Sequence, residues 1–442
     1  MLFKPTSNRA TALIVGLPWL RTGTGKVMET QITYLRSRDL KTVFVAVPHN
    51  TTQRRSNEVW SGFSSQSSEL GADVTMIATF SDRISKGGKI GRWYNARRKL
   101  NAMHWAMRAA AVSPIPDELE AELRSGRIAI LLVNHIYALQ FGLKVKERLN
   151  RLGQAVPLIL VTHDVQSHIL LDNDILNPFT RKLDSLDELL ETEIAALKSA
   201  DVLVHVSTED KRFFETAIPD KPHILTLPTS EDLSNFKHPF PNEGGNDLLF
   251  VGSDNINNYH ALEWFFSRIQ PWLGTSAASI LILGRINKLL EHRNPRLYDQ
   301  VKHQLIGSVA DTLPYYLRSK SVVIPMVGGR GVSVKTVEAA AIGRPIVGTG
   351  FAYRGLPMEA VKTAGLRVCD DPREFALEVL DTLKQPREKE EASRSLFRQL
   401  FSYDRFEKSM DEALEASHLL HFQKKTIATD DIDVNVAKTE LF

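Results

Sequence analysis

Residues 328–345 contain the pattern that most constrains the fold of this chain. An apolar run from Ser321 to Pro325 is typical of a buried strand, and a second short run, Pro345 to Val347, follows the segment. Between them lie a glycine-rich loop and a helix expected to begin near Val332. Glycines let the backbone turn sharply, and the first turn of a helix presents free N–H groups. The pattern therefore predicts a strand–loop–helix–strand unit with an anion site at the start of its helix.

Two charged residues just inside this helix indicate what the anion could be. Lys335 and Glu338 are spaced as neighbours on the helix surface. A cation gains nothing from the dipole at a helix start, so a phosphate is the better explanation for Lys335. The Glu338 carboxylate can accept two hydrogen bonds from a vicinal diol such as a ribose. The alternative is a solvated Lys–Glu pair worth ~0.2–0.5 kcal/mol, but the glycines and flanking strands favour a ligand site.

The rest of the chain alternates short apolar runs with segments of helical spacing. Its 442 residues are enough for two or three domains. One series of apolar runs occupies 12–16, 42–47, 74–77, 128–133, 158–161 and 202–206, and a second occupies 247–252, 280–284 and 304–307. Such alternation predicts the α/β class, with two Rossmann-like doubly wound domains that face a cleft. The expected boundaries are 1–227, a linker at 228–246, 247–400, a helix at 401–420 and a tail at 421–442.

The glycine-rich segment resembles the nucleotide-sugar signature of GT-B glycosyltransferases, most closely family 4 (group 1). The matching residues are Pro325, Gly329, Gly331, Lys335, Glu338, Ala339, Gly343, Pro345 and Gly355. The resemblance implies a nucleotide diphosphate sugar as donor, held by Gly329, Arg330, Gly331, Val332, Ser333, Lys335 and Glu338. It also implies Glu338 on the ribose, a last helix packed on the first domain, retention of configuration, and no metal or other cofactor.

Some positions depart from the family pattern. Arg330 stands where the family often has a second Glu near the donor sugar. An Arg and a Lys that many relatives carry in the first turn of the second domain are absent after Gly252. Arg285 could substitute for them, and a salt bridge at the rim is an equally good interpretation. The segment with Gly307, Asp311 and the pair Tyr315-Tyr316 resembles the one that lies near the nucleotide base.

Candidate catalytic residues follow predicted strands of the first domain. His163 and Asp164 follow the run 158–161, and His135 follows 128–133, so we expect all three to face the cleft. The resemblance implies that His163 lies beside the departing phosphate, where an imidazole with a pKa near neutrality could share charge. Each histidine could instead hydrogen-bond a neighbouring loop. Asp164 could hold the imidazole or contact an acceptor hydroxyl, or it could equally cap the next segment. A metal site of His163, Asp164 and His168 is a weaker alternative because it lacks a fourth ligand.

The first glycine-bearing loop is also expected at the cleft. Gly23 and Gly25 lie in Gly23-Thr24-Gly25-Lys26, which superficially resembles a phosphate loop. However, Val27 stands where a magnesium-binding Ser or Thr is required, and the first glycine is misplaced. This excludes a nucleoside triphosphatase of that type. We expect Gly23 and Gly25 at the cleft, near the donor phosphates or the acceptor, and His135 at the acceptor or elsewhere in the cleft.

Composition and charge narrow the location and the partners. The only cysteine is Cys369, and no run approaches the ~20 apolar residues of a membrane span, so we expect a cytoplasmic protein. Residues 83–108 contain eight basic residues and no acidic one, together with aromatic residues. This segment predicts peripheral contact with an anionic membrane, or alternatively a solvated helix packed through its aromatic rings. No nucleic-acid-binding module is recognisable.

The predicted function is transfer of a sugar from a nucleotide diphosphate sugar to a hydroxyl of a glycan, polysaccharide or lipid-linked acceptor. One alternative is a nucleotide-sugar epimerase of similar fold, which needs the same donor loop. The other is a catalytically silent nucleotide-sugar-binding protein, suggested by Arg330 and the missing cations.

Overall fold

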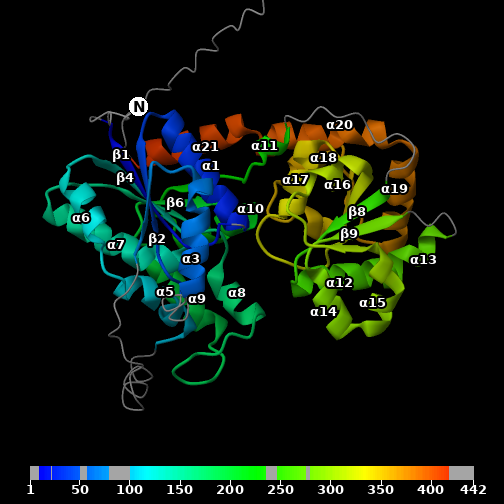
Figure 1. Cartoon of the computed structure of the whole chain (residues 1–442), viewed down its shortest axis with the longest axis horizontal. Helices are drawn as coiled ribbons and strands as arrows, with labels where there is room; N and C mark the ends of the chain where they lie inside the picture. The colour runs from blue at the N-terminus through cyan, green and yellow to red at the C-terminus, as the bar shows by residue number, and fades with distance from the viewer. Residues whose placement is uncertain are drawn as a thin grey trace, which may run out of the picture.

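A computed structural model describes residues 9–20, 22–49, 57–78, 100–234, 246–274 and 279–417 of the chain. Two parallel sheets lie side by side, each covered by helices (Figure 1). This confirms the predicted α/β class with two doubly wound sheets. Residues 83–99 of the basic segment, most of the expected linker and the whole of the tail 421–442 lie outside the described residues.

The first sheet has seven parallel strands in the order β3-β2-β1-β4-β5-β6-β7. Its strands are β1 (Thr11–Gly16), β2 (Lys41–Ala46), β3 (Val74–Ile77), β4 (Ile128–Asn134), β5 (Leu158–Val161), β6 (Val202–His205) and β7 (His223–Leu225). Its helices are α1 (Gly23–Ser37), α3 (Asn57–Gln66), α5 (Ala102–Val112), α6 (Asp117–Arg124), α7 (Ile136–Arg151), α8 (Gln166–Asp172), α9 (Leu186–Leu197) and α10 (Thr208–Ala217). The short helix α11 (Glu231–Ser234) follows β7 and packs on the core of the second half.

Both faces of this first sheet are buried, which explains its continuous apolar strands. In β1, Leu13 and Val15 pack with α5, α7 and α9, whereas Ala12 and Ile14 pack with α1 and α3 on the other face. Leu13 is in register with Val43 of β2 on one side and with Leu131 of β4 on the other. The carboxyl ends of all the strands therefore lie at one edge of the sheet.

The second sheet has five parallel strands in the order β10-β9-β8-β11-β12. Its strands are β8 (Asn246–Val251), β9 (Ile280–Leu283), β10 (Leu305–Gly307), β11 (Ser319–Ile324) and β12 (Ile346–Gly348). Its helices are α12 (Ile256–Trp264), α13 (Gln270–Leu273), α14 (Ile286–Arg293), α15 (Pro295–Val301), α16 (Leu313–Arg318), α17 (Val334–Ile342), α18 (Met358–Thr363), α19 (Pro372–Lys384) and α20 (Pro386–Leu396).

The last helix, α21 (Tyr403–Ala416), packs on the first sheet rather than on the second (Figure 1). Its Phe406 and Met410 join the core on the α1 face. Its Asp411 accepts a hydrogen bond from the Tyr34 hydroxyl at 2.6 Å and two from one nitrogen of the Arg38 guanidinium. Because Arg38 is buried, this ion pair ties the end of the chain to α1.

None of the described helices is long and apolar enough to cross a membrane.

Candidate active site

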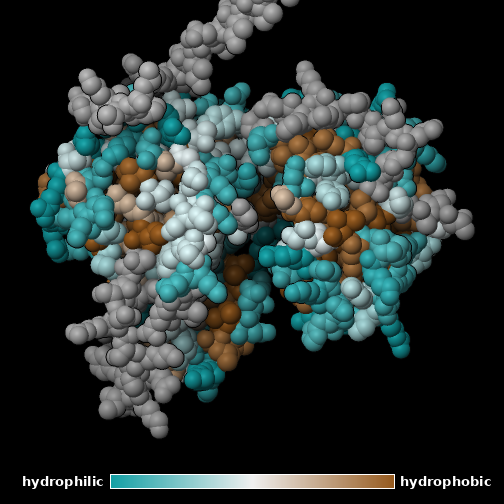
Figure 2. Space-filling view, viewed as in Figure 1, coloured by the Kyte–Doolittle hydropathy of each residue, from teal (hydrophilic) through white to brown (hydrophobic). Residues whose placement is uncertain are grey.

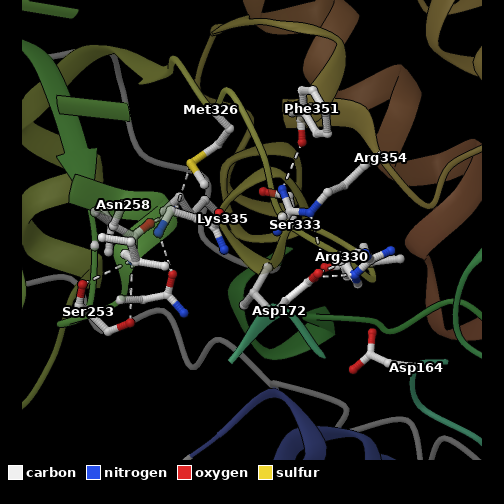
Figure 3. A pocket seen from close by; sticks show the side chains of 18 of the residues that line it. Asp164, Asp172, Ser253, Asn258, Met326, Arg330, Ser333, Lys335, Phe351 and Arg354 are labelled. Carbon is white, nitrogen blue, oxygen red and sulfur yellow. Dashed lines mark hydrogen bonds and ion pairs between the residues drawn. The ribbon is translucent and has the colours of Figure 1, made fainter. Parts of the chain in front are cut away.

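A cleft of about 1020 Å³ lies between the two halves, at the carboxyl ends of both sheets (Figure 3). The first half contributes residues that follow β5 and lie along α8. The second half contributes the turn after β8, the loop between β11 and α17, and the 3₁₀ turn after β12. The polar lining residues are Asp164, Asp172, Asn173, Ser253, Asn255, Asn257, Asn258, Arg330, Ser333, Lys335, Glu338 and Arg354.

The glycine-rich loop is shaped by two glycines with positive φ. Gly329 has φ 129° and Gly331 has φ 61°, conformations that side-chain-bearing residues rarely adopt. A Cβ on Gly331 would lie 2.3 Å from Oδ1 of Asp164, which belongs to the first half. Glycine at this position therefore lets the loop approach the opposite wall of the cleft.

Helix α17 begins two residues later than the sequence pattern predicted. Ser333 is extended, with φ −74° and ψ 102°, and acts as the N-cap residue, so Val334 is the first helical residue and Val332 belongs to the loop. Because Gly331 is left-handed, the chain needs these two further residues to enter the helix. The free N–H groups of α17 are nevertheless at the cleft, since Ser333, Val334 and Lys335 all line it.

Lys335 lies largely below the surface of the second half. Its ammonium donates a hydrogen bond of 2.6 Å to Oδ1 of Asn258 and lies 5.4 Å from the centre of the Phe250 ring. Burial lowers the pKa of Lys335 to about 7, with the Arg354 guanidinium contributing to the same shift. No ion pair joins Lys335 to Glu338 among the described residues. The alternative of a solvated Lys–Glu pair is therefore wrong.

Glu338 is held by a tyrosine beneath α17. Its Oε2 accepts a hydrogen bond of 2.8 Å from the Tyr316 hydroxyl, and Tyr316 is fully buried. Burial raises the pKa of Glu338, and the hydrogen bond from Tyr316 opposes this shift. Because Glu338 also lines the cleft, one oxygen is fixed by Tyr316 while the carboxylate faces the cavity. Tyr316 thus orients Glu338 from below and does not itself line the cleft.

His163 and Asp164 both follow β5, but only Asp164 lines the cleft, whereas His163 is buried. His163 is buried, has φ 63°, and its Nε2 lies 3.1 Å from Oδ1 of Asn134. Burial lowers the pKa of His163 to about 4, so the expected pKa near neutrality is wrong and the ring is neutral at pH 7. Asp164 lines the cleft. Burial raises the pKa of the Asp164 carboxyl to about 7, with Asp210 adding to the shift and the Arg354 and Arg330 guanidiniums opposing it.

His135 is buried and serves as the N-cap residue of α7. Its Nδ1 accepts a hydrogen bond of 3.3 Å from the Tyr137 amide, and its ring stacks at 5.8 Å on that of His163. Burial lowers the pKa of His135 far below its ordinary value. This geometry matches the interpretation in which His135 hydrogen-bonds its own loop, and it places the ring behind His163 and not in the lining of the cleft.

Of the other predicted site residues, Gly23 lies near the start of α17, whereas Arg285 lies away from the cleft. Gly23 begins α1, and a Cβ there would lie 3.4 Å from Cγ2 of Val334, so the starts of α1 and α17 are neighbours. Gly25 lies against the backbone of Leu20. Arg285 does not line the cleft; its side chain is 70% exposed and lies 3.9 Å from Asp254, which is the salt bridge at the rim that the sequence left open.

The metal alternative fails within the described part of the chain. No group of three His, Cys, Asp or Glu side chains there is arranged to hold a metal ion, so His163, Asp164 and His168 form no such site.

Two arginines at the cleft make contacts that the sequence did not predict. Arg330 forms a two-nitrogen ion pair with Asp172 of α8, with Nε to Oδ2 at 2.5 Å and Nη2 to Oδ1 at 3.1 Å. It therefore bridges the two halves (Figure 3). Arg354 donates from Nε to the Arg330 carbonyl at 3.1 Å and from Nη1 to the Phe351 carbonyl at 2.7 Å. Arg354 supplies a cation beside the glycine loop that no motif pointed to.

Comparisons with known proteins agree with this architecture. Residues 245–385 match the family model described as glycosyl transferases group 1. No curated protein matches the sequence.

Several solved structures share the fold at low sequence identity. The Anabaena protein HepE, solved in complex with UDP and glucose, is 12% identical, with 92% of this chain and 100% of that chain covered and a TM-score of 0.56. A glycosyltransferase from Rickettsia africae is 11% identical, with coverage of 92% and 99% and a TM-score of 0.57. TarM, of S. aureus, is 9% identical, with coverage of 92% and 98% and a TM-score of 0.59. Residues 245–385 therefore form a glycosyl transferases group 1 domain, within a chain that has the GT-B glycosyltransferase fold.

Proposed function

We propose that this protein is a glycosyltransferase that moves a sugar from a nucleotide diphosphate sugar to an acceptor hydroxyl. The observation that carries the proposal is the cleft, in which the start of α17, Lys335 and Glu338 face Asp164 from the other half. The group 1 family match of residues 245–385 and the structure of HepE with UDP and glucose support the same donor class.

The donor phosphates would bind at the start of α17. The residues at the start of this helix line the cleft, and so do Lys335 and Arg354. Burial lowers the pKa of Lys335 to about 7, and a bound diphosphate would supply the negative charge that stabilises its ammonium form. Glu338, fixed by Tyr316, would accept two hydrogen bonds from the ribose diol.

Charge develops on the diphosphate as the bond from the sugar C1 to the phosphate oxygen breaks. Fixed cations and helix N–H groups stabilise such charge more in a partly enclosed cleft than in water. Lys335, Arg354 and the start of α17 are the groups placed to do this. We further propose, on the family resemblance, that the reaction needs no metal ion and that the anomeric configuration is retained.

The acceptor hydroxyl would approach C1 beside Asp164, from the same face as the departing diphosphate, because attack from the opposite face would invert the anomeric configuration. As the new C1–O bond forms, the hydroxyl must lose its proton, and a carboxyl with a pKa of about 7 is suited to accept it near neutral pH. His163 is neutral, is hydrogen-bonded to Asn134 and does not line the cleft, so it would act only by holding its neighbour Asp164 in place, without carrying charge. His163 is therefore a positioning residue in this proposal, with Asp164 as the catalytic one.

Calorimetric titration with a panel of nucleotide diphosphate sugars tests the donor assignment. We expect at least one donor to bind the wild type, and Glu338→Ala to weaken binding by about tenfold or more, because it removes two charge-assisted hydrogen bonds. Glu359→Ala, an exposed glutamate of α18, is the matched control and should bind like the wild type. If no donor binds, or if both variants bind equally well, the donor site is wrongly assigned. Donor binding without transfer to any acceptor would instead indicate the silent binding protein.

A further inference from the structure

Aromatic side chains gather where four neighbouring strands of the first sheet end. Trp19 follows β1, His49 follows β2, His135 and Tyr137 follow β4, and His163 follows β5. These strands are adjacent in the order β2-β1-β4-β5, so their carboxyl ends bring the five rings together. We call these five residues the aromatic cluster.

The rings of the aromatic cluster are in contact, and its outer members are only half-buried. The Trp19 ring lies edge-on to the rings of His49 and His135, with centroids at 5.3 Å and 5.4 Å. The Tyr137 ring lies 5.4 Å from that of His49 and 4.4 Å from that of His135. His135 and Tyr137 are buried, whereas Trp19 and His49 keep part of their surface accessible. The cluster therefore has a buried base and accessible outer rings.

One buried hydroxyl of the aromatic cluster has no partner. Tyr137 is 5% exposed, yet its hydroxyl makes no hydrogen bond to any residue that the structure describes. A buried hydroxyl without a partner is unfavourable, and most such groups in proteins are paired. Phenylalanine would fill the same space without this penalty. The unpaired hydroxyl therefore indicates a ligand that supplies a hydrogen bond here.

The charged groups that act on the aromatic cluster are carboxyls. Burial raises the pKa of Tyr137, and the carboxyls of Glu193 and Asp164 add to this shift. Burial lowers the pKa of His135, with His163 and His49 adding to the shift, so the His135 ring is neutral at pH 7. No Lys or Arg of the described residues contributes to either shift. A phosphate would gain no attraction here, whereas a neutral ligand with hydroxyl groups would meet no repulsion.

The aromatic cluster lies beside the carboxyl that we propose as the catalytic base. The His135 ring is 5.4 Å from that of Trp19 and 5.8 Å from that of His163, and Asp164 directly follows His163. Figure 2 shows the surface hollowed between the two halves, where the cleft is open to solvent. A short oligosaccharide that lies on Trp19 can therefore extend to Asp164.

We propose that the aromatic cluster binds a neutral sugar ring of the acceptor, with the apolar face of a pyranose against Trp19. The carbon–hydrogen face of a pyranose suits an indole ring, and a sugar hydroxyl can pair with that of Tyr137. A lipid chain would bring no hydrogen bond to Tyr137, and a phosphorylated acceptor would bring a charge that the cluster does not attract. This inference rests on the proposed function, because it names the acceptor class of the same reaction.

Saturation-transfer NMR with neutral saccharides tests the proposal, with and without a donor. The probes are cellobiose, maltose, lactose and di-N-acetylchitobiose, and glycerol 3-phosphate represents the charged alternative. We expect at least one saccharide to bind the wild type. Trp19→Ala should weaken this binding by about tenfold or more, and Tyr137→Phe by about threefold to tenfold. Trp272→Ala is the matched control, since this tryptophan is 55% exposed on the second half, and it should bind like the wild type.

Two further measurements separate saccharide binding from folding and from the donor site. Trp19→Phe keeps an aromatic ring, so it should recover most of the binding that Trp19→Ala loses. Calorimetry should show equal donor binding by Trp19→Ala and the wild type, because Trp19 lies on the first half.

The inference is overturned if the wild type binds a donor but no saccharide, a result that leaves the proposed function intact. Failure to bind any donor would instead overturn the proposed function. The inference is also overturned if Trp19→Ala and Tyr137→Phe bind saccharides like the wild type, or if glycerol 3-phosphate accepts sugar and none of the saccharides does.

Discussion

Replacing Asp164 by asparagine should raise stability while removing activity. The carboxyl lies in the cleft against Gly331, and burial raises its pKa from 3.8 to about 7. A shift of about three units corresponds to at most roughly 4 kcal/mol of cost for the ionised form in the folded protein. Because the carboxyl lines an open cleft, we expect a cost of about 1–2 kcal/mol.

The direction of the pH dependence follows from the raised pKa. The folded protein is most stable relative to the unfolded chain below the ordinary pKa of aspartate, where Asp164 is protonated in both states. This stability is lost as the pH rises through about 7 and the buried carboxyl ionises. Asparagine carries no charge at any pH. The advantage of Asp164→Asn over the wild type should therefore grow by roughly 1 kcal/mol between pH 5 and pH 8, or about 2–4 °C in melting temperature.

Melting curves between pH 5 and pH 8 measure the stability of both proteins, and transfer assays measure their activity. Asp164→Asn should lose about 10²–10⁴-fold in transfer rate, because an amide cannot accept the proton. Asp172→Asn is a control for which we expect the opposite change in stability. Pairing with Arg330 lowers the pKa of Asp172, so this variant should be less stable than the wild type at pH 8. An Asp164→Asn protein that is destabilised equally at both pH values would refute the reasoning.

Three other perturbations test separate parts of the structure. A bound diphosphate should raise the pKa of Lys335, which burial has lowered to about 7, so donor affinity should fall by up to about tenfold per pH unit above pH 7. Calorimetry in two buffers should show proton uptake on binding, and an affinity independent of pH would contradict this. Gly331→Ala should abolish donor binding, because its Cβ would lie 2.3 Å from the Asp164 carboxylate oxygen. The control Gly365→Ala has a similar φ of 85°, but the nearest atom to its Cβ is 3.9 Å away, so this variant should bind donor normally. Equal donor binding by both variants would argue against close approach of the loop to Asp164. Asp411→Ala should cost about 1–2 kcal/mol in urea unfolding, because the buried Arg38 loses its nearer carboxylate and keeps only Glu407 at 4.0 Å; an unchanged midpoint would show that α21 contributes little.

Local sequence patterns were sufficient to predict most of the strands and the position of the glycine-rich loop, but not the short strand β7. The run 158–161 is β5 and the run 128–133 lies within β4, because buried parallel strands are apolar throughout and need no partner to be recognised. Asp371 caps α19 by accepting from the amides of Arg373 and Glu374, a local interaction of a kind that sequence alone can indicate. The start of α17 was missed by two residues, since the length of a loop depends on its dihedral angles and not on residue type alone.

Long-range contacts could not be predicted from one sequence. Arg330 and Asp172 are 158 positions apart, and only the placement of the two halves brings them together. The hydrogen bond from Lys335 to Asn258 depends on packing within the second half, as does the burial that lowers the pKa of Lys335. The neutral His163 is a further case, because burial and not sequence context sets its pKa.

The decisive experiment is a crystal structure with a bound nucleotide diphosphate sugar. We expect the diphosphate at the start of α17, with the Lys335 ammonium moved from Asn258 to within about 3 Å of a phosphate oxygen and Glu338 hydrogen-bonded to the ribose diol. A nucleotide bound away from α17, with Lys335 still on Asn258, would contradict it.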